Sequence, residues 1–96
     1  MIRSFKDKRT EDVYDGRASK HTRSFPQELL KSARRKLDLI NGAIRLEDLR
    51  VPPGNRLHKL SRDLKEFWSV SINDQWRIIF RWEDKDALDV EITDYH

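Results

Sequence analysis

Alternating apolar residues in the second half of the chain constrain the fold more than any other feature. Every second residue is apolar in two runs that flank a turn-forming Asn-Asp pair: Trp68, Val70 and Ile72, then Trp76, Ile78, Phe80 and Trp82. A period of two is typical of a β-strand that buries one face. The pattern therefore predicts two antiparallel strands whose apolar faces pack on the helical part of the chain.

The first half has helical spacing instead. Apolar residues recur every three or four positions at Leu29, Leu30, Ala33, Leu37 and Ile40. Ser24-Phe25-Pro26-Gln27 before them has the spacing of a capping box, and Gly42 after them is suited to a left-handed helix end. A shorter helix is expected from Thr10, as its N-cap, to Gly16, and a further helical turn at residues 44–49.

Further strands are expected on both sides of these helices. We predict a short strand at residues 2–6 and, after an extended Val51-Pro52-Pro53-Gly54 connection, strands at residues 56–60, 67–72, 75–82 and 88–93. A chain of 96 residues is too short for two hydrophobic cores. Helices followed by strands predict one α+β domain over residues 1–96, with the helices packed on one face of a twisted, mainly antiparallel sheet.

Composition bears on the cellular compartment and on the kinds of metal or membrane site that the protein can have. The sequence contains no cysteine, which excludes disulfides and thiolate metal sites, and its three scattered histidines predict no metal centre. No apolar run approaches the ~18 residues of a membrane helix, and the N-terminus lacks the apolar stretch of a signal peptide. We therefore expect a cytoplasmic protein that needs no cofactor and does not associate with membranes.

Charge is unevenly distributed along the chain. Residues 1–62 hold 16 Lys and Arg against 8 Asp and Glu, whereas residues 63–96 hold 4 against 9. A basic half favours phosphate-bearing partners, and the helix face formed by Lys31, Arg34, Arg35 and Lys36 is one place to bind them. A row of charges on a helix is also the ordinary appearance of a solvated face. A non-catalytic nucleic-acid-binding module is therefore one hypothesis for the function.

Two arginines fall on the strand face opposite the apolar one. Arg77 and Arg81 lie four residues apart in the predicted strand 75–82, on the same face as Ile79, which lies between them. They form the best anion site in the sequence. The alternative is that they pair across the sheet with Asp89 or Glu91.

The remaining groups suited to chemistry are His58 and the final residues Asp94-Tyr95-His96. Two imidazoles, an arginine pair, a tyrosine and an aspartate are the groups needed to cleave RNA by internal attack of the ribose 2′-hydroxyl. Each has an ordinary explanation as well, because a lone strand histidine is often structural and terminal residues often fray. Spacing alone does not show that these side chains meet.

Four segments resemble a known family of proteins. They are Leu57-His58, Phe67-Trp68-Ser69-Val70, the run from Asn73 to Phe80, and Asp94-Tyr95-His96 after a Trp-Arg-Ile strand. Together they resemble the HigB-type, plasmid-maintenance killer toxins of the RelE superfamily. The resemblance runs along the whole chain and is most specific over residues 50–96.

The resemblance implies a compact RelE-like fold and a ribosome-dependent endoribonuclease that cuts mRNA in the ribosomal A site without a metal or cofactor. It also implies a helix-turn-helix antitoxin as protein partner, beside the ribosome and mRNA. By position, the catalytic residues would be His58, Arg77, Asp94, Tyr95 and His96. Which histidine is the base and which the acid stays open at this point.

Departures from the family pattern bear on RNA binding. Some relatives carry a lysine where this chain has Ser61, and a basic residue where it has Asn73 and Asp74. Lys59, Arg62 and Arg81 are then the residues expected to bind RNA phosphates. The same departures support the alternative of a non-catalytic protein that binds only nucleic acid or an antitoxin.

Overall fold

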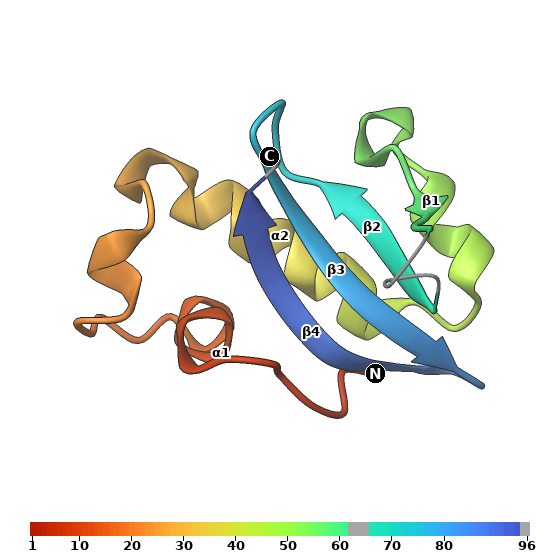
Figure 1. The fold of residues 1–96 in the computed structure, drawn as a ribbon, viewed down its shortest axis with the longest axis horizontal. Helices are drawn as coiled ribbons and strands as arrows, with labels where there is room; N and C mark the ends of the chain where they lie inside the picture. The colour runs from red at the N-terminus through yellow and green to blue at the C-terminus, as the bar shows by residue number, and fades with distance from the viewer. Residues whose placement is uncertain (62–65, 95–96) are drawn as a thin grey trace.

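The computed structural model describes residues 1–61 and 66–94, and it has the α+β architecture predicted from the sequence (Figure 1). The helical elements are α1 (Lys8–Asp15), η1 (Thr22–Ser24), η2 (Gln27–Leu29), α2 (Leu30–Gly42), η3 (Leu46–Arg50) and η4 (Pro53–Asn55). The strands are β1 (His58–Lys59), β2 (Phe67–Ser71), β3 (Trp76–Glu83) and β4 (Asp86–Asp94). They form one antiparallel sheet in the order β1-β2-β3-β4, which confirms the predicted meander.

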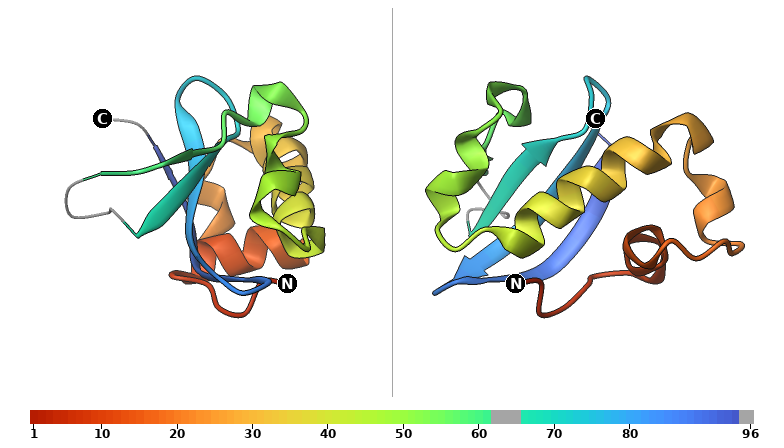
Figure 2. Two further views of the ribbon diagram at one scale, coloured as in Figure 1. Left: turned by 90° about the vertical axis from the view of Figure 1, so that its right-hand side faces the viewer. Right: turned by 180° about the vertical axis from the view of Figure 1, so that it is seen from behind.

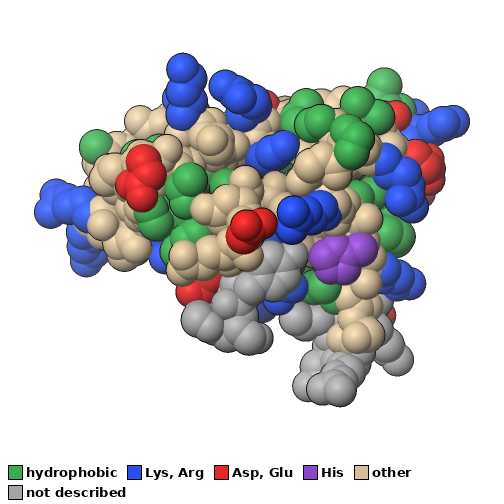
Figure 3. Space-filling view, turned by 90° about the horizontal axis from the view of Figure 1, so that it is seen from above, with side chains coloured by type: hydrophobic (Ala, Val, Ile, Leu, Met, Phe, Trp, Pro, Cys, Tyr) green, Lys and Arg blue, Asp and Glu red, His purple; other side chains and the backbone are tan. Residues whose placement is uncertain are grey.

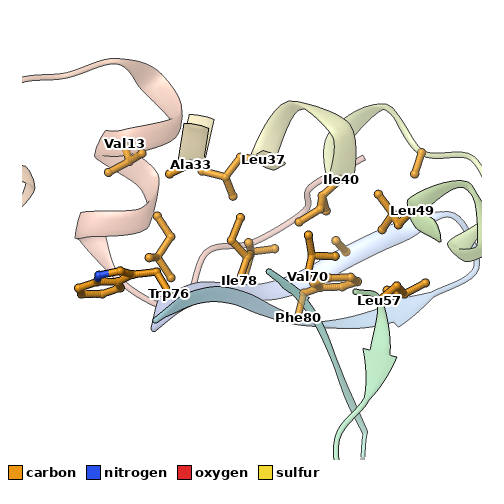
Figure 4. Packing of buried hydrophobic residues seen from close by; sticks show 14 of the residues in the cluster. Val13, Ala33, Leu37, Ile40, Leu49, Leu57, Val70, Trp76, Ile78 and Phe80 are labelled. Carbon is orange, nitrogen blue, oxygen red and sulfur yellow. The ribbon is translucent and has the colours of Figure 1, made fainter. Parts of the chain in front are cut away.

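The helices lie on one side of the sheet, and the edge-on view in Figure 2 shows the two layers. The core between them contains Leu37 and Ile40 of α2, which face Val70, Ile78 and Phe80 of the sheet (Figure 4). Trp76 packs at one end of this layer and Leu49 and Leu57 at the other. The alternating residues thus face the helices, as the period of two predicts.

Helix α1 begins and ends differently from the prediction. Its N-cap is Asp7, whose carboxylate accepts the Thr10 N–H at 2.8 Å, so Thr10 lies inside the helix and is fully buried. Gly16 at its C-terminus has φ +72°, a left-handed conformation that costs glycine little because it lacks a Cβ. Gly42 does not have a positive φ, so the left-handed helix end predicted there was wrong and Ala43 closes α2 in an extended conformation.

The capping box predicted at Ser24 and Gln27 was also wrong. The Gln27 side-chain amide donates to the carbonyls of Thr22 and Phe25 at 2.9 and 2.8 Å, so it stabilises the turn before the helix instead of the helix end. A turn of 3-10 helix, η2, then leads into α2. The Pro-Pro-Gly connection likewise contains η4 where we expected a purely extended segment.

The N-terminal segment runs along the outer edge of β4, the side that does not face β3 (Figure 1). Ile2 and Phe5 form isolated parallel bridges with Ala87 and Val90, so residues 2–6 lie where a strand was predicted but pair only at two points. Asp89 between those bridges has φ +53°, and the register of β3 and β4 shifts there. This bulge keeps Ala87 and Val90 both directed into the core.

Candidate functional site

The sheet face opposite the helices carries two of the catalytic residues that the sequence predicts, His58 and Arg77. Strand pairing aligns His58 with Ser69, and Ser69 with Ile79, in one row across this outer face. The next row, two residues along β2, aligns Ser71 with Arg77. The Cα atoms of His58 and Arg77 are therefore about 12 Å apart, two strands across and two residues along, which is close enough for both long side chains to reach one phosphate between them.

His58 is exposed on the two-residue strand β1. Its Nδ1 lies 2.8 Å from the Arg56 carbonyl oxygen, which can only accept, so Nδ1 carries the hydrogen. The neutral ring consequently keeps its lone pair on Nε2. This tautomer has the form needed by a base that takes a proton from a substrate.

The position of β1 is fixed by a buried amide just before it. Asn55 is fully buried, and its side chain donates to the carbonyls of Leu49 and Val51 at 3.1 and 3.3 Å and accepts a short hydrogen bond from Lys36. Burial lowers the pKa of the Lys36 ammonium group. Lys36 is therefore a structural residue that links α2 to the start of the sheet, not a member of a solvated basic row.

Arg77 lies half-buried on the outer face beside two serines that sequence reasoning did not single out. Ser69 and Ser71 are buried, and neither hydroxyl has a hydrogen-bond partner in the structure as described. The alternation that placed Arg77 on this face could have found them, because Ser69 and Ser71 share its register. His58, Arg77 and these two hydroxyls therefore form one group of polar side chains on the outer face.

The structure does not bring the whole predicted catalytic set onto this face. The register pairs Asp94 with Trp76, so the Asp94 side chain starts from the helix side of the sheet, opposite to the face of Arg77. Tyr95, His96 and Arg62 lie outside the described residues. Their roles stay predictions.

The other two residues predicted to bind RNA start from opposite faces of the sheet, Lys59 beside Trp68 and Arg81 beside Phe67. Lys59 and Arg81 line a hollow of about 370 Å³ together with Glu66, Trp68, Trp82 and Glu83. Arg81 donates to Asp89 at 3.0 Å and to Glu83 at 3.2 Å, so the cross-strand pairing considered for it is present. The Lys59 ammonium group lies 6.0 Å from the Trp68 ring centroid.

The basic face of α2 borders a second, larger hollow. Lys31, Arg34 and Arg35 are exposed there and line a space of about 780 Å³ between α1 and α2. Arg34 is partly engaged, since its Nε donates to the Tyr14 carbonyl at 3.2 Å. In the view from above in Figure 3, Lys and Arg side chains are scattered over that face and do not form one stripe. On the helix side, Lys31, Arg34 and Arg35 are the exposed cations that border the hollow.

Glu91 provides a test of the electrostatics of the outer face. It pairs with Ile79, and burial, with the nearby Asp7 carboxylate, raises the pKa of its carboxyl group. Because the carboxyl pKa of Glu91 is higher in the folded protein, ionised Glu91 destabilises the fold once the pH rises above 4.5, the ordinary pKa of a glutamate side chain. We expect Glu91→Gln to raise Tm at pH 7 and to lose this gain below pH 4. Thermal melts across this range test the effect, and an equal gain at both pH values would contradict the assignment.

Within residues 1–61 and 66–94, no group of three or more His, Asp or Glu side chains is arranged to hold a metal ion. The same residues contain no helix long and apolar enough to span a membrane.

Comparisons with known proteins place this site in a family context. The chain is 40% identical over 88 residues to Toxin HigB-1 of Vibrio cholerae, covering 92% of this chain and 90% of that protein. It is 28% identical over 96 residues to Endoribonuclease HigB of Proteus vulgaris, covering the whole of both. These relatives match the resemblance found in the sequence.

Solved structures of low sequence identity share the fold. A YoeB dimer from Staphylococcus aureus superposes with a TM-score of 0.58 at 18% identity, over 99% of this chain and 97% of that one. YafQ from Escherichia coli gives 0.51 at 19% identity, over 94% and 89%. The predicted RelE-like fold is thereby confirmed. The family model for HigB, described as a RelE-like toxin of type II toxin-antitoxin systems, matches residues 3–96, and this chain belongs to that family of toxins.

Proposed function

We propose that this toxin is a metal-independent endoribonuclease that enters the ribosomal A site and cuts the mRNA presented there. One observation carries the proposal: the Nε2 lone pair of His58 and the guanidinium of Arg77 occupy the same helix-free face of the sheet. A base and a fixed cation on one open face are what phosphodiester cleavage by internal attack requires. The Proteus vulgaris relative, named as an endoribonuclease, supports the same activity.

In the proposed reaction, His58 Nε2 takes the proton of a ribose 2′-hydroxyl, and the 2′-oxygen forms a bond to the adjacent phosphorus. Arg77 stabilises the negative charge that develops on the pentavalent phosphorus. The bond from phosphorus to the 5′-oxygen then breaks, and His96 protonates that oxygen. The products are a 2′,3′-cyclic phosphate and a free 5′-hydroxyl, so atoms and protons balance.

Tyr95 and the remaining cations hold the substrate in this scheme. Tyr95 stacks on a base of the codon or orients the 2′-hydroxyl. Asp94 starts from the opposite face of the sheet and is given no contact with the substrate. Lys59, Arg62 and Arg81 bind phosphates on either side of the cut. The ribosome supplies the rest of the orientation by holding the codon in the A site.

Primer extension on a defined mRNA tests the proposal. Purified protein is incubated with ribosomes that carry the message, beside the same message without ribosomes and beside the His58→Ala and His96→Ala variants. We expect cuts at A-site codons that require the ribosome and that fall by at least about 100-fold in either variant, since one acid or base contributes that much or more. A folded wild-type protein that leaves the message uncut would show that it is not this enzyme.

We propose a helix-turn-helix antitoxin as the protein partner and the cytoplasm as the place of action. Membership of a type II toxin-antitoxin family supports both. Adding the antitoxin to the cleavage assay is expected to suppress the cuts. If RNA binding instead survives His58→Ala, Arg77→Ala and His96→Ala with no cleavage by the wild type, the non-catalytic binding module is the correct alternative.

A further inference from the structure

A residue in the left-handed backbone conformation lies two positions before His58. Arg56 has φ +49° and ψ +45°, although it is not a glycine. The Cβ atom makes this conformation unfavourable for most L-residues, so it persists only where the surrounding structure holds it. Its place beside the candidate base makes the contacts of Arg56 informative about the site.

Contacts on both sides hold Arg56 in this conformation. Before it, the peptide N–H groups of Asn55 and Arg56 donate to the carbonyls of Pro52 and Pro53 at 2.9 and 3.0 Å. Asn55 is fully buried, and Leu57 on the other side is 9% exposed and packs in the core. Arg56 is thus an exposed residue between two buried neighbours. The chain cannot relax at Arg56 without withdrawing one of them from the interior.

The side chain of Arg56 contributes little to holding this turn. Its Nη1 lies 3.5 Å from the Asp74 carboxylate, but the two side chains are 64% and 95% exposed. An ion pair so open to water stabilises a fold only slightly, because solvent screens the attraction. What Arg56 contributes to its surroundings is therefore its backbone, not its charge.

The backbone conformation of Arg56 determines where its carbonyl points. At ψ +45° the carbonyl oxygen lies 2.8 Å from His58 Nδ1. An extended residue has ψ near about +135°, so a return to extended backbone would turn the carbonyl by about 90° about the Cα–C bond. The hydrogen bond that leaves the His58 lone pair on Nε2 consequently depends on the left-handed conformation of Arg56.

We propose that Arg56 is a positioning residue of the toxin that acts through its left-handed backbone, whose carbonyl holds the neutral His58 ring with the hydrogen on Nδ1 and the lone pair on Nε2. This inference rests on the proposed function, in which Nε2 takes the proton of a ribose 2′-hydroxyl. Without that carbonyl the ring is free to turn and to carry its hydrogen on Nε2. A ring in that form has no lone pair at the position of the base.

Arg56→Val and Arg56→Gly together test the inference. Both remove the same charge, but only valine, which is β-branched, is strongly disfavoured at positive φ. We expect Arg56→Gly to keep kcat for ribosome-dependent cleavage within about threefold of wild type. Arg56→Val is expected to lower kcat by about 10- to 100-fold relative to Arg56→Gly, because the base is misplaced. KM should be the same in the two variants, since any loss of attraction for RNA phosphates is common to both.

NMR reads the tautomer of His58 without any cleavage. Two-bond proton–nitrogen correlation spectra recorded at about pH 8.5, above the ordinary pKa of imidazole, distinguish hydrogen on Nδ1 from hydrogen on Nε2. We expect mainly the Nδ1–H form in the wild type and in Arg56→Gly, and mainly the Nε2–H form in Arg56→Val. His58→Ala identifies the His58 signals among those of the three histidines.

The conformation of residue 56 is checked in each folded variant by the coupling between its amide and Hα protons, which reports φ. If the valine variant keeps a positive φ, Arg56→Pro replaces it, because the proline ring fixes φ near about −65°. Equal tautomer populations or equal kcat in that variant and in Arg56→Gly overturn the inference, while cleavage by the wild type leaves the proposed function in place. A message left uncut by the folded wild-type protein overturns the proposed function, and the inference with it, whatever the tautomers.

Discussion

Arg77→Ala is expected to lower the rate of ribosome-dependent mRNA cleavage by about 100- to 1,000-fold, the usual cost of removing one preorganised group that stabilises transition-state charge. Arg77 is half-buried on the outer face of β3, in the row of Ser71 and Thr93, so its charge is held close to where the phosphorane would form. Because that charge matters most in the transition state, the loss should appear in kcat more than in KM. Single-turnover cleavage of a ribosome-bound message measures it.

Arg50→Ala is the charge-matched control, since Arg50 is exposed in η3 on the helix side of the molecule and its loss changes the net charge by the same amount. Cleavage by this variant should match the wild type. Arg77→Lys keeps the charge but loses the bidentate fork and should fall between the two. Cleavage by Arg77→Ala within about threefold of wild type would remove Arg77 from the mechanism.

Phe80→Ala is expected to destabilise the fold by about 3–5 kcal/mol, because it leaves a large cavity in the core. Phe80 is fully buried on the central strand β3, and its ring contacts Trp82 edge-on at 6.4 Å between centroids. A loss of this size is a large part of the total stability of about 5–15 kcal/mol of an ordinary domain. Urea unfolding followed by tryptophan fluorescence measures the change.

Ile44→Ala serves as the comparison for Phe80→Ala. Ile44 is 63% exposed after the end of α2, and truncating it should change the free energy of unfolding by less than about 0.5 kcal/mol. A cost below about 1 kcal/mol for Phe80→Ala would mean that the layer between α2 and the sheet is packed differently from the structure.

Much of this fold could be predicted from periodicity. The faces of Val70, Trp76 and Phe80 followed from a spacing of two, and α2 followed from a spacing of three and four. Both patterns involve several residues, so neither prediction depends on any single residue. The α+β class and the antiparallel meander depended only on these signals and on the order in which they occur.

Single-residue features were harder to predict, because each depends on a choice between chemically similar partners. Asp7 and Thr10 are both good helix caps, and only the folded chain shows that Asp7 caps α1 while Thr10 bonds to β4. In the sequence Lys36 looks like its exposed basic neighbours, but in the folded chain its ammonium group donates to the side-chain oxygen of the buried Asn55. The same distinction holds for the candidate site. Periodicity was enough to predict the sheet face of Arg77, whereas the tautomer of His58 could be assigned only from its contact with the Arg56 carbonyl in the folded chain.

The parallel bridges between the first residues and β4 also bear on the order in which the parts of the sheet can form. A chain is synthesised from its N-terminus, so residues 1–6 cannot pair until their partners Ala87 and Val90 have been made and released from the ribosome. Contacts that span more than 80 residues close the sheet last, since the loop between them must form first. The edge of β4 is therefore completed only after Ala87 and Val90 can meet the N-terminal segment.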